Sequence, residues 1–196
     1  MRRLKYISWV CLAPLSIISM VAIPSKTLSG QQRLLAGSDK YKSKLYLDSA
    51  ILLYKRYTII VKKHNDSPGE DITVITKASK KCSIIDIPEA YSAQYFSGLK
   101  QNKVVIDAGT GNLRRNFIYD LKKDRLVDSI YHVLGAIKIC NQRLYYLAMM
   151  SDSRIKKMNL PVCSNPGMEL SGYVEYAYYN FITRKTRPTG KYECLN

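Results

Sequence analysis

Beyond residue 44 the apolar positions come in short pulses separated by turn-forming residues, which is the pattern of a β-rich chain. Residues 57–61 and 71–76 are rich in β-branched side chains and flank a turn at residues 64–69 that contains proline, glycine and asparagine. We therefore expect these two runs to pair as a hairpin. The apolar pulse at residues 51–54 fits either a strand or a helical turn.

The best-patterned region, residues 103–150, predicts an antiparallel meander of four or five strands. Two hairpins within it are centred on short polar loops at residues 122–124 and 141–143. Residues 151–170 are rich in proline, asparagine and glycine and predict a loop crossing. The run 172–183 is apolar on both faces, which is typical of a central strand.

One segment departs from the strand pattern. Residues 82–87 predict a strand, and Pro88 then stands where a first helical residue would be favoured. Four apolar residues recur after it at intervals of three to four: Tyr91, Tyr95, Phe96 and Leu99. This spacing predicts a short helix over residues 88–98 that ends at Gly98. The fold class expected is α+β and β-rich, mainly an antiparallel meander sheet with one short helix, stapled by disulfides.

The first residues carry a targeting pattern. A basic start, Met1–Lys5, precedes an apolar run at residues 6–23, which is typical of a secretory signal or a membrane anchor. The run is close to the shortest helix that spans a bilayer, so cleavage and retention both stay open. Either places the remainder outside the cytoplasm, periplasmic or secreted, with membrane contact only through residues 6–23. The expected organisation is a signal peptide or anchor (1–25), a mobile lead-in (26–43) and a single β-rich domain (44–196).

The cysteine count agrees with export. Cys11 lies in the targeting segment, and an even set follows it: Cys82, Cys140, Cys163 and Cys194. An even number in an exported chain predicts disulfides, each stabilising by roughly 2–4 kcal/mol. Three pairings are open. We favour Cys140–Cys163 with Cys82–Cys194, because the first closes the shortest loop.

Charge indicates the kind of partner. The formal net charge is +16, which favours an anionic envelope component or an acidic protein and, outside the cytoplasm, no nucleic acid. Tyrosines near the C-terminus accompany basic residues, and stacking rings with pairing cations suit an acidic surface. The binding residues expected on this basis are Tyr173, Tyr176, Arg184, Lys185 and Arg187. The function predicted is a binding protein, in one form inhibitor- or immunity-like. The same tyrosines could instead only pack within a sheet.

The alternative function is a hydrolase built on Asp107. The run Val105–Gly111 is similar to the first phosphate-binding turn of the sugar-kinase, actin and heat-shock ATPase superfamily. That resemblance implies an aspartate on a hydrated metal and glycines at phosphate. The chain after Gly111 is too short for the rest of such a site, and ATP is scarce outside the cytoplasm. Asp-x-Gly also resembles the aspartic-protease turn, although Ala108 replaces the usual hydroxyl residue.

The plain alternative for this run is a glycine-rich connection. If the protein is an enzyme, we expect an extracytoplasmic hydrolase that uses Asp107 with Asp120 or Asp128. The two histidines, His64 and His132, have no zinc-site spacing with the cysteines, so we expect no metal and no cofactor.

Overall fold

The computed structural model describes residues 37–85, 87, 93–163 and 171–195, which belong to one compact unit, Gln32–Asn196. The predicted targeting segment and the lead-in up to residue 36 lie outside the described residues. Across the described ranges, no helix is both long and apolar enough to cross a membrane.

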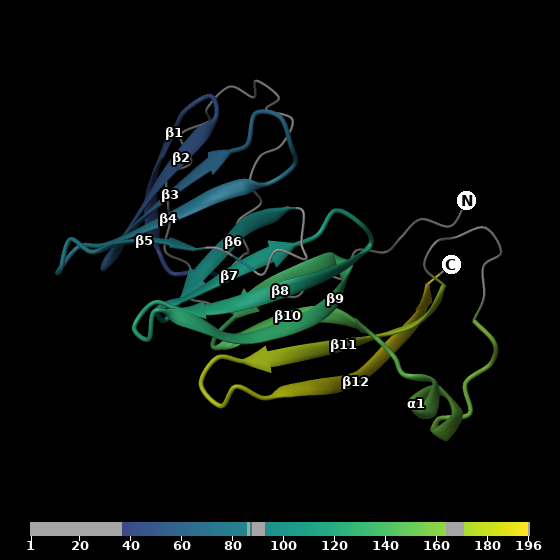
Figure 1. The fold of residues 1–196 in the computed structure, drawn as a ribbon. Coiled ribbons are helices and arrows are strands. Elements are labelled where there is room, and N and C mark those ends of the chain that lie inside the picture. The colour runs from purple at the N-terminus through teal and green to yellow at the C-terminus, as the bar shows by residue number, and fades with distance from the viewer. Residues whose placement is uncertain (1–36, 86, 88–92, 164–170, 196) are drawn as a thin grey trace, which may run out of the picture. The chain divides into compact units, whose positions relative to one another are not determined.

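Two antiparallel sheets account for the described chain (Figure 1). The five-stranded sheet has the order β1-β2-β3-β4-β5, and the seven-stranded sheet has the order β12-β11-β10-β9-β8-β7-β6. Each strand therefore pairs with its neighbour in the sequence, so both sheets are meanders. The predicted β-rich, antiparallel fold class is confirmed.

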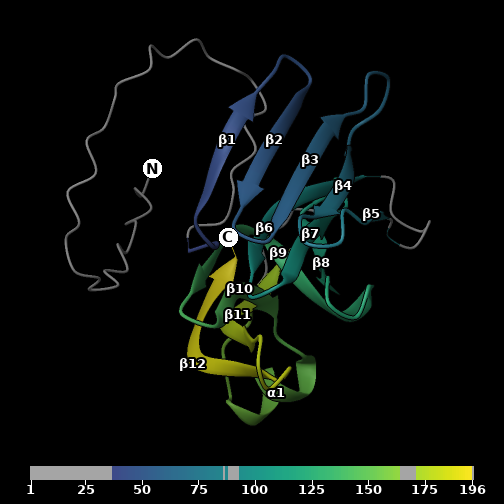
Figure 2. The same ribbon diagram turned by 90° about the vertical axis from the view of Figure 1, so that its left-hand side faces the viewer.

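The strands of the five-stranded sheet, seen side by side in Figure 2, are β1 (Tyr41–Leu45), β2 (Ser49–Tyr54), β3 (Tyr57–Lys63), β4 (Glu70–Thr76) and β5 (Cys82–Ile85). The predicted hairpin is β3–β4, and the ambiguous run at residues 51–54 is part of a strand. Burial alternates along β2 and β3, so one face of this sheet is apolar. That face shares a core with the seven-stranded sheet, in which Leu52, Ile59 and Ile72 join Phe96, Ile106 and Phe117. Burying each such side chain contributes about 1.5–3 kcal/mol.

The seven-stranded sheet comprises β6 (Gln94–Lys100), β7 (Lys103–Ala108), β8 (Leu113–Asp120), β9 (Arg125–Cys140), β10 (Arg143–Met149), β11 (Gly172–Asn180) and β12 (Thr186–Leu195). Both predicted hairpins are present, as β8–β9 and β9–β10. β11 lies between β10 and β12, as its two apolar faces predicted. A second core cluster includes Val105, Ile118, Ile130 and Leu144, so this sheet has apolar side chains on both faces.

The predicted helix over residues 88–98 is wrong for the part that can be seen, because residues 94–100 form strand β6; residues 88–92 lie outside the described residues. The cause is a β-bulge. Phe96 pairs with Ile106 and Leu99 with Val104, so three residue steps in β6 oppose two in β7. Phe96 and Leu99 therefore reach the same core at a helix-like spacing. Gly98 makes the bulge possible: its φ is +158°, and a Cβ there would lie 2.2 Å from Ser38 Oγ.

The one helix in the described chain, α1 (Asp152–Lys157), lies where a loop was predicted. It has no buried residue, so its sequence has no apolar face to signal it. Asp152 in its first turn favours the helix through the backbone dipole. Arg154 Nη2 lies 2.7 Å from Glu175 Oε1 and joins α1 to β11.

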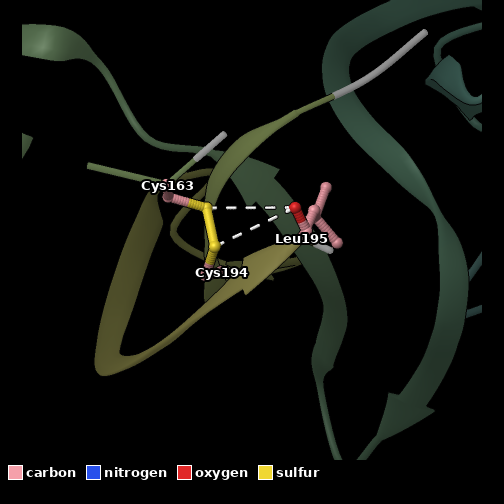
Figure 3. Close-up of a disulfide and its surroundings, with 3 residues drawn as sticks. All are labelled: Cys163, Cys194 and Leu195. Atoms are coloured by element: carbon pink, nitrogen blue, oxygen red, sulfur yellow. Dashed lines mark hydrogen bonds between the residues drawn. A yellow bond between two sulfur atoms is a disulfide. The ribbon is translucent and has the colours of Figure 1, made fainter. Parts of the chain in front are cut away.

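The favoured disulfide pairing is wrong. Cys163 is bonded to Cys194, with Cα atoms 5.8 Å apart, and both sulfurs lie 3.9 Å from the carbonyl oxygen of Leu195 (Figure 3). Cys82 is an exposed free thiol at the start of β5. β5 and β12 are edge strands of different sheets, which explains why Cys82 and Cys194 do not meet. Cys140 is also disulfide-bonded, so it is not a free thiol.

Candidate partner-binding face

Four side chains of the seven-stranded sheet form a row across four consecutive strands. The strand register places Lys138 of β9 opposite Tyr145 of β10, Tyr145 opposite Tyr178 of β11, and Tyr178 opposite Arg187 of β12. Residues directly opposite each other in a ladder project from the same face of the sheet. We call this row, together with Arg143, the tyrosine face.

The neighbours of this row in sequence point the other way. Leu144, Tyr146 and Tyr179 belong to the second core cluster, and they alternate with Tyr145 and Tyr178 along β10 and β11. The two strands thus bury one set of rings and leave the other set half-exposed. Since the buried set fixes the register against a core, the positions of the half-exposed rings are set by packing on the opposite face.

Aromatic rings and cations lie in contact on the tyrosine face. The ring centroids of Tyr145 and Tyr178 are 5.7 Å apart, with planes inclined by 46°. The guanidinium carbon of Arg143 lies 4.4 Å from the centroid of the Tyr178 ring, in the geometry of a cation–π contact. Hydrogen bonding with Tyr145 and the nearby Tyr178 raise the pKa of Arg143. Arg143 and Arg187 are exposed, so the face offers flat rings edged by positive charge.

The five binding residues predicted from the sequence are only partly brought together. Arg187 belongs to the row. Tyr176 lies two residues from Tyr178, and therefore on the same side of β11, and its hydroxyl donates to Glu193 Oε1 at 3.4 Å. Lys185 is exposed in the turn before β12.

The other two residues point elsewhere. Tyr173 is 8% exposed and packs edge-on against Tyr192, with centroids 6.0 Å apart. Arg184 is engaged by Asp128, 3.4 Å from its Nε, and by the carbonyl of Val127. The tyrosine face also contains four residues that were not among the five predicted: Lys138, Arg143, Tyr145 and Tyr178. Ala177 is a signal that could have placed Tyr178 on the face opposite the core, whereas residues 144–147, Leu-Tyr-Tyr-Leu, do not distinguish Tyr145 from Tyr146.

Asp107, the centre of the alternative function, lies within β7, and its carboxylate is fully engaged. Oδ1 lies 3.1 Å from His132 Nε2, and Oδ2 lies 3.2 Å from Arg114 Nη1. Arg114 and His132 are directly opposite each other on β8 and β9. Arg114 also lies over the ring of Tyr95, with its guanidinium carbon 5.1 Å from the centroid. The residue that was expected to be a catalytic carboxylate is thus the anionic centre of a cluster of buried polar side chains.

The geometry of His132 does not suit a general base. The ring is 0% exposed, and its Nδ1 lies 3.1 Å from the carbonyl oxygen of Val133. The carbonyl oxygen only accepts, so Nδ1 is directed at it as a donor, and Nε2 is directed at the Asp107 carboxylate. Neither ring nitrogen therefore points to a place where a substrate could give it a proton.

The other two candidate carboxylates do not lie beside Asp107. Asp107 is opposite Asn116, and Asp120 lies four residues further along β8, about 13 Å away at roughly 3.3 Å per residue. Asp120 Oδ1 accepts hydrogen bonds from the backbone N–H groups of Lys122 and Lys123, and so closes the β8–β9 turn.

Asp128 instead accepts a hydrogen bond from the hydroxyl of Tyr179 at 3.0 Å. In the parts of the chain that the structure describes, no three histidine, cysteine or acidic side chains are grouped to hold a metal ion. The glycine-rich run is the connection between β7 and β8, where Gly109 has a φ of +110°. A positive φ of this kind is the ordinary reason for glycine in a turn.

The buried cluster around Asp107 contains polar atoms without a partner. Oδ1 and Nδ2 of Asn116, which is 0% exposed, make no hydrogen bond with the described residues, and neither do Nε and Nη2 of Arg114. Such groups cost about 1–3 kcal/mol each when nothing satisfies them. This cost makes Asn116 a sensitive position for stability.

A scan against protein-family models found no match, and searches of curated proteins and of solved structures found none either. The function is therefore argued from the geometry of the chain alone.

Proposed function

We propose that this protein is an exported, non-enzymatic binding protein that recognises an anionic envelope component or an acidic protein through the tyrosine face. The observation that carries the proposal is the register-fixed row of Lys138, Tyr145, Tyr178 and Arg187, with Arg143 stacked on Tyr178. Inhibition or neutralisation of an acidic partner is one form that such a function takes.

Electrostatics and ring geometry support this proposal in different ways. The net charge of +16 raises the local concentration of anionic partners and the rate of encounter with them. Tyrosine rings give rigid contact area at low entropic cost, and exposed arginines pair with carboxylates in a fixed geometry. Three strand spacings separate Lys138 from Arg187, which is about 14 Å at roughly 4.8 Å per strand. A row of this length fits an extended acidic segment better than a single small ion.

Export rests on two observations. The basic start and apolar run of the first 23 residues have the form of a secretory signal or an anchor. The Cys163–Cys194 disulfide is compatible with an oxidising compartment, where such bonds persist. Both agree with a binding protein that works outside the cytoplasm.

The test compares two charge-matched double variants of the whole chain. Arg143→Gln with Arg187→Gln removes two cations from the tyrosine face, and Lys122→Gln with Lys123→Gln removes two exposed cations from the β8–β9 turn. Binding to poly-L-glutamate and to phosphatidylglycerol vesicles is measured at low and at physiological salt. We expect the first variant to lose at least tenfold in affinity for one of the two probes, and the second to lose much less.

Two results would count against the proposal. Equal losses in both double variants would show that only net charge matters. Affinity that does not change with salt would remove the electrostatic part of the argument, because exposed charges are screened beyond about 10 Å at 0.1 M. Tyr178→Leu adds a third comparison, since it keeps the apolar volume and removes the ring on which Arg143 stacks.

A further inference from the structure

A cavity of about 620 Å³ lies away from the tyrosine face, at one end of β2 and β3. Three connections line it: residues 39–40 ahead of β1, the β2–β3 turn at residues 54–57, and the β6–β7 turn at residues 101–102. Its volume falls within the range of about 300–1,000 Å³ that is usual for sites that take small molecules.

The charge around this cavity is unbalanced. Lys40, Lys55 and Arg56 all line it and are exposed, and none of them has an ion pair with the residues described. The one carboxylate in the lining, Asp39, is already neutralised, because Lys100 Nζ lies 3.3 Å from its Oδ1. Asp39 Oδ2 also accepts a hydrogen bond of 2.9 Å from the backbone N–H of residue 101. The cavity therefore favours an anion.

The neutral polar side chains that line the cavity are held in a fixed orientation by a hydrogen bond. The hydroxyl of Tyr57 donates to Asn102 Oδ1 at 2.9 Å, which orients the amide and leaves Nδ2 as a donor. Asn102 has a φ of +66°, a left-handed conformation that asparagine adopts readily in tight turns. The backbone of the turn thus holds the amide beside the cations.

The apolar residues beside the cavity are packed into the fold. Tyr54 and Leu99 border the cavity but are each only 2% exposed, so they support its lining and present almost no surface of their own. Tyr54 packs against Tyr41 with ring centroids 5.2 Å apart, and Lys77 Nζ donates to its backbone carbonyl at 2.6 Å. Together the lining offers an oriented amide donor and three cations.

We propose that this cavity binds an acidic sugar, with the carboxylate of a uronic acid toward Lys55 and Arg56. A hydroxyl group of the sugar would accept a hydrogen bond from Asn102 Nδ2, and the sugar ring would occupy the volume between the amide and the cations. An inorganic anion would use the cations alone and leave the amide and most of the volume unfilled. A neutral sugar would leave the cations without a counter-charge. The site involves none of the residues of the tyrosine face, so it is a second binding site and not part of the proposed function above.

Titration of the isotope-labelled whole chain, followed by amide chemical shifts, tests this inference. The probes are a glucuronate-containing disaccharide, its neutral analogue cellobiose, and inorganic sulfate. We expect the acidic disaccharide to shift signals of residues 39–40, 54–57 and 101–102, with an affinity at least tenfold above that for either other probe. The double variant Lys55→Gln with Arg56→Gln should lose at least tenfold in that affinity, whereas Lys122→Gln with Lys123→Gln should keep it.

Asn102→Gly provides a variant that keeps the turn, because glycine adopts a positive φ without strain and only the amide is lost. It should weaken the acidic disaccharide more than sulfate. Three results would overturn the inference: no shifts in the three connections at millimolar disaccharide, sulfate binding as tightly as the disaccharide, or cellobiose doing so. The Arg143→Gln and Arg187→Gln pair should leave this titration unchanged, so failure here is distinct from failure of the tyrosine face.

Discussion

Replacing Asp107 by asparagine distinguishes a structural ion pair from a catalytic carboxylate. The side chain of Asp107 is 14% exposed and accepts hydrogen bonds from two potentially cationic groups, Arg114 and His132. The amide of Asp107→Asn keeps the shape of the carboxylate and removes its charge. The guanidinium of Arg114 would then be left in a largely buried position without its counter-ion.

The expected cost follows from these contacts. Removing one partner of a buried pair costs about 3–5 kcal/mol, and a hydrogen bond to a charged group contributes about 1.5–3 kcal/mol. The Arg114 side chain is 13% exposed and the amide oxygen of the variant can still accept a hydrogen bond from it, which reduces the loss. We expect the free energy of unfolding to fall by about 3 kcal/mol, which for a domain of this size lowers the Tm by roughly 6–12 °C.

Urea unfolding and calorimetry of the purified chain measure this change. Asp66→Asn is the control, because Asp66 is exposed in the turn between β3 and β4 and should alter stability by less than about 0.5 kcal/mol. If Asp107→Asn unfolds at the same urea concentration as Asp66→Asn, the ion-pair argument is refuted. The variant should still bind the partner of the tyrosine face; loss of a hydrolytic activity with unchanged stability would instead favour the alternative function.

Three further changes test other parts of the fold. Replacing Cys163 and Cys194 together by serine should lower the free energy of unfolding by about 3.7 kcal/mol, from the entropy of a loop with a separation of 31 residues, whereas Cys82→Ser should change it little in the same urea assay. Asn116→Leu removes two unsatisfied buried polar atoms and should raise the Tm in calorimetry; a lower Tm would show that the amide is satisfied in solution. Burial raises the pKa of Tyr146 to about 12, so the folded state holds this proton more tightly than the unfolded chain does. The stability that depends on this proton is therefore complete below pH 10 and is lost as the pH rises through 12, and Tyr146→Phe should flatten stability against pH in this window.

Local sequence information was enough for the hairpins and insufficient for the bulge. The β3–β4, β8–β9 and β9–β10 hairpins each have apolar runs on both sides of a polar turn, so pattern and pairing agree. The sequence of β6 predicts a helix because the bulge places Phe96 and Leu99 on one side at a spacing of three. At the bulge the backbone of Gly98 lies close to Ser38, which is far from it in sequence. No window of residues around β6 contains that contact.

The predicted disulfide pairing is wrong for a related reason. Loop length favours the nearest cysteines, but the sheets decide which cysteines can approach each other. The end of β12 returns beside the start of β11, where Tyr173 is opposite Cys194, and the segment that follows α1 places Cys163 there. The choice thus depends on the register of two strands, which the cysteine spacing does not encode.

The tyrosine face shows why a site of this kind is only partly readable from sequence. Composition predicts binding by tyrosines and cations near the C-terminus, and of the five residues predicted Arg187 lies in the row. Which tyrosines are available to a partner depends on the face of the sheet that each one occupies. Tyr173 and Tyr178 are an odd number of residues apart along β11, so their side chains project from opposite faces. Parity could have been inferred from Ala177 and Tyr179, which are buried with the second core cluster. The alignment of Lys138, Tyr145, Tyr178 and Arg187 could not, because it needs the register of three separate ladders at once. One residue of slip in any ladder would move its tyrosine to the core face and separate the row. The core that fixes the register is therefore also what specifies the proposed site.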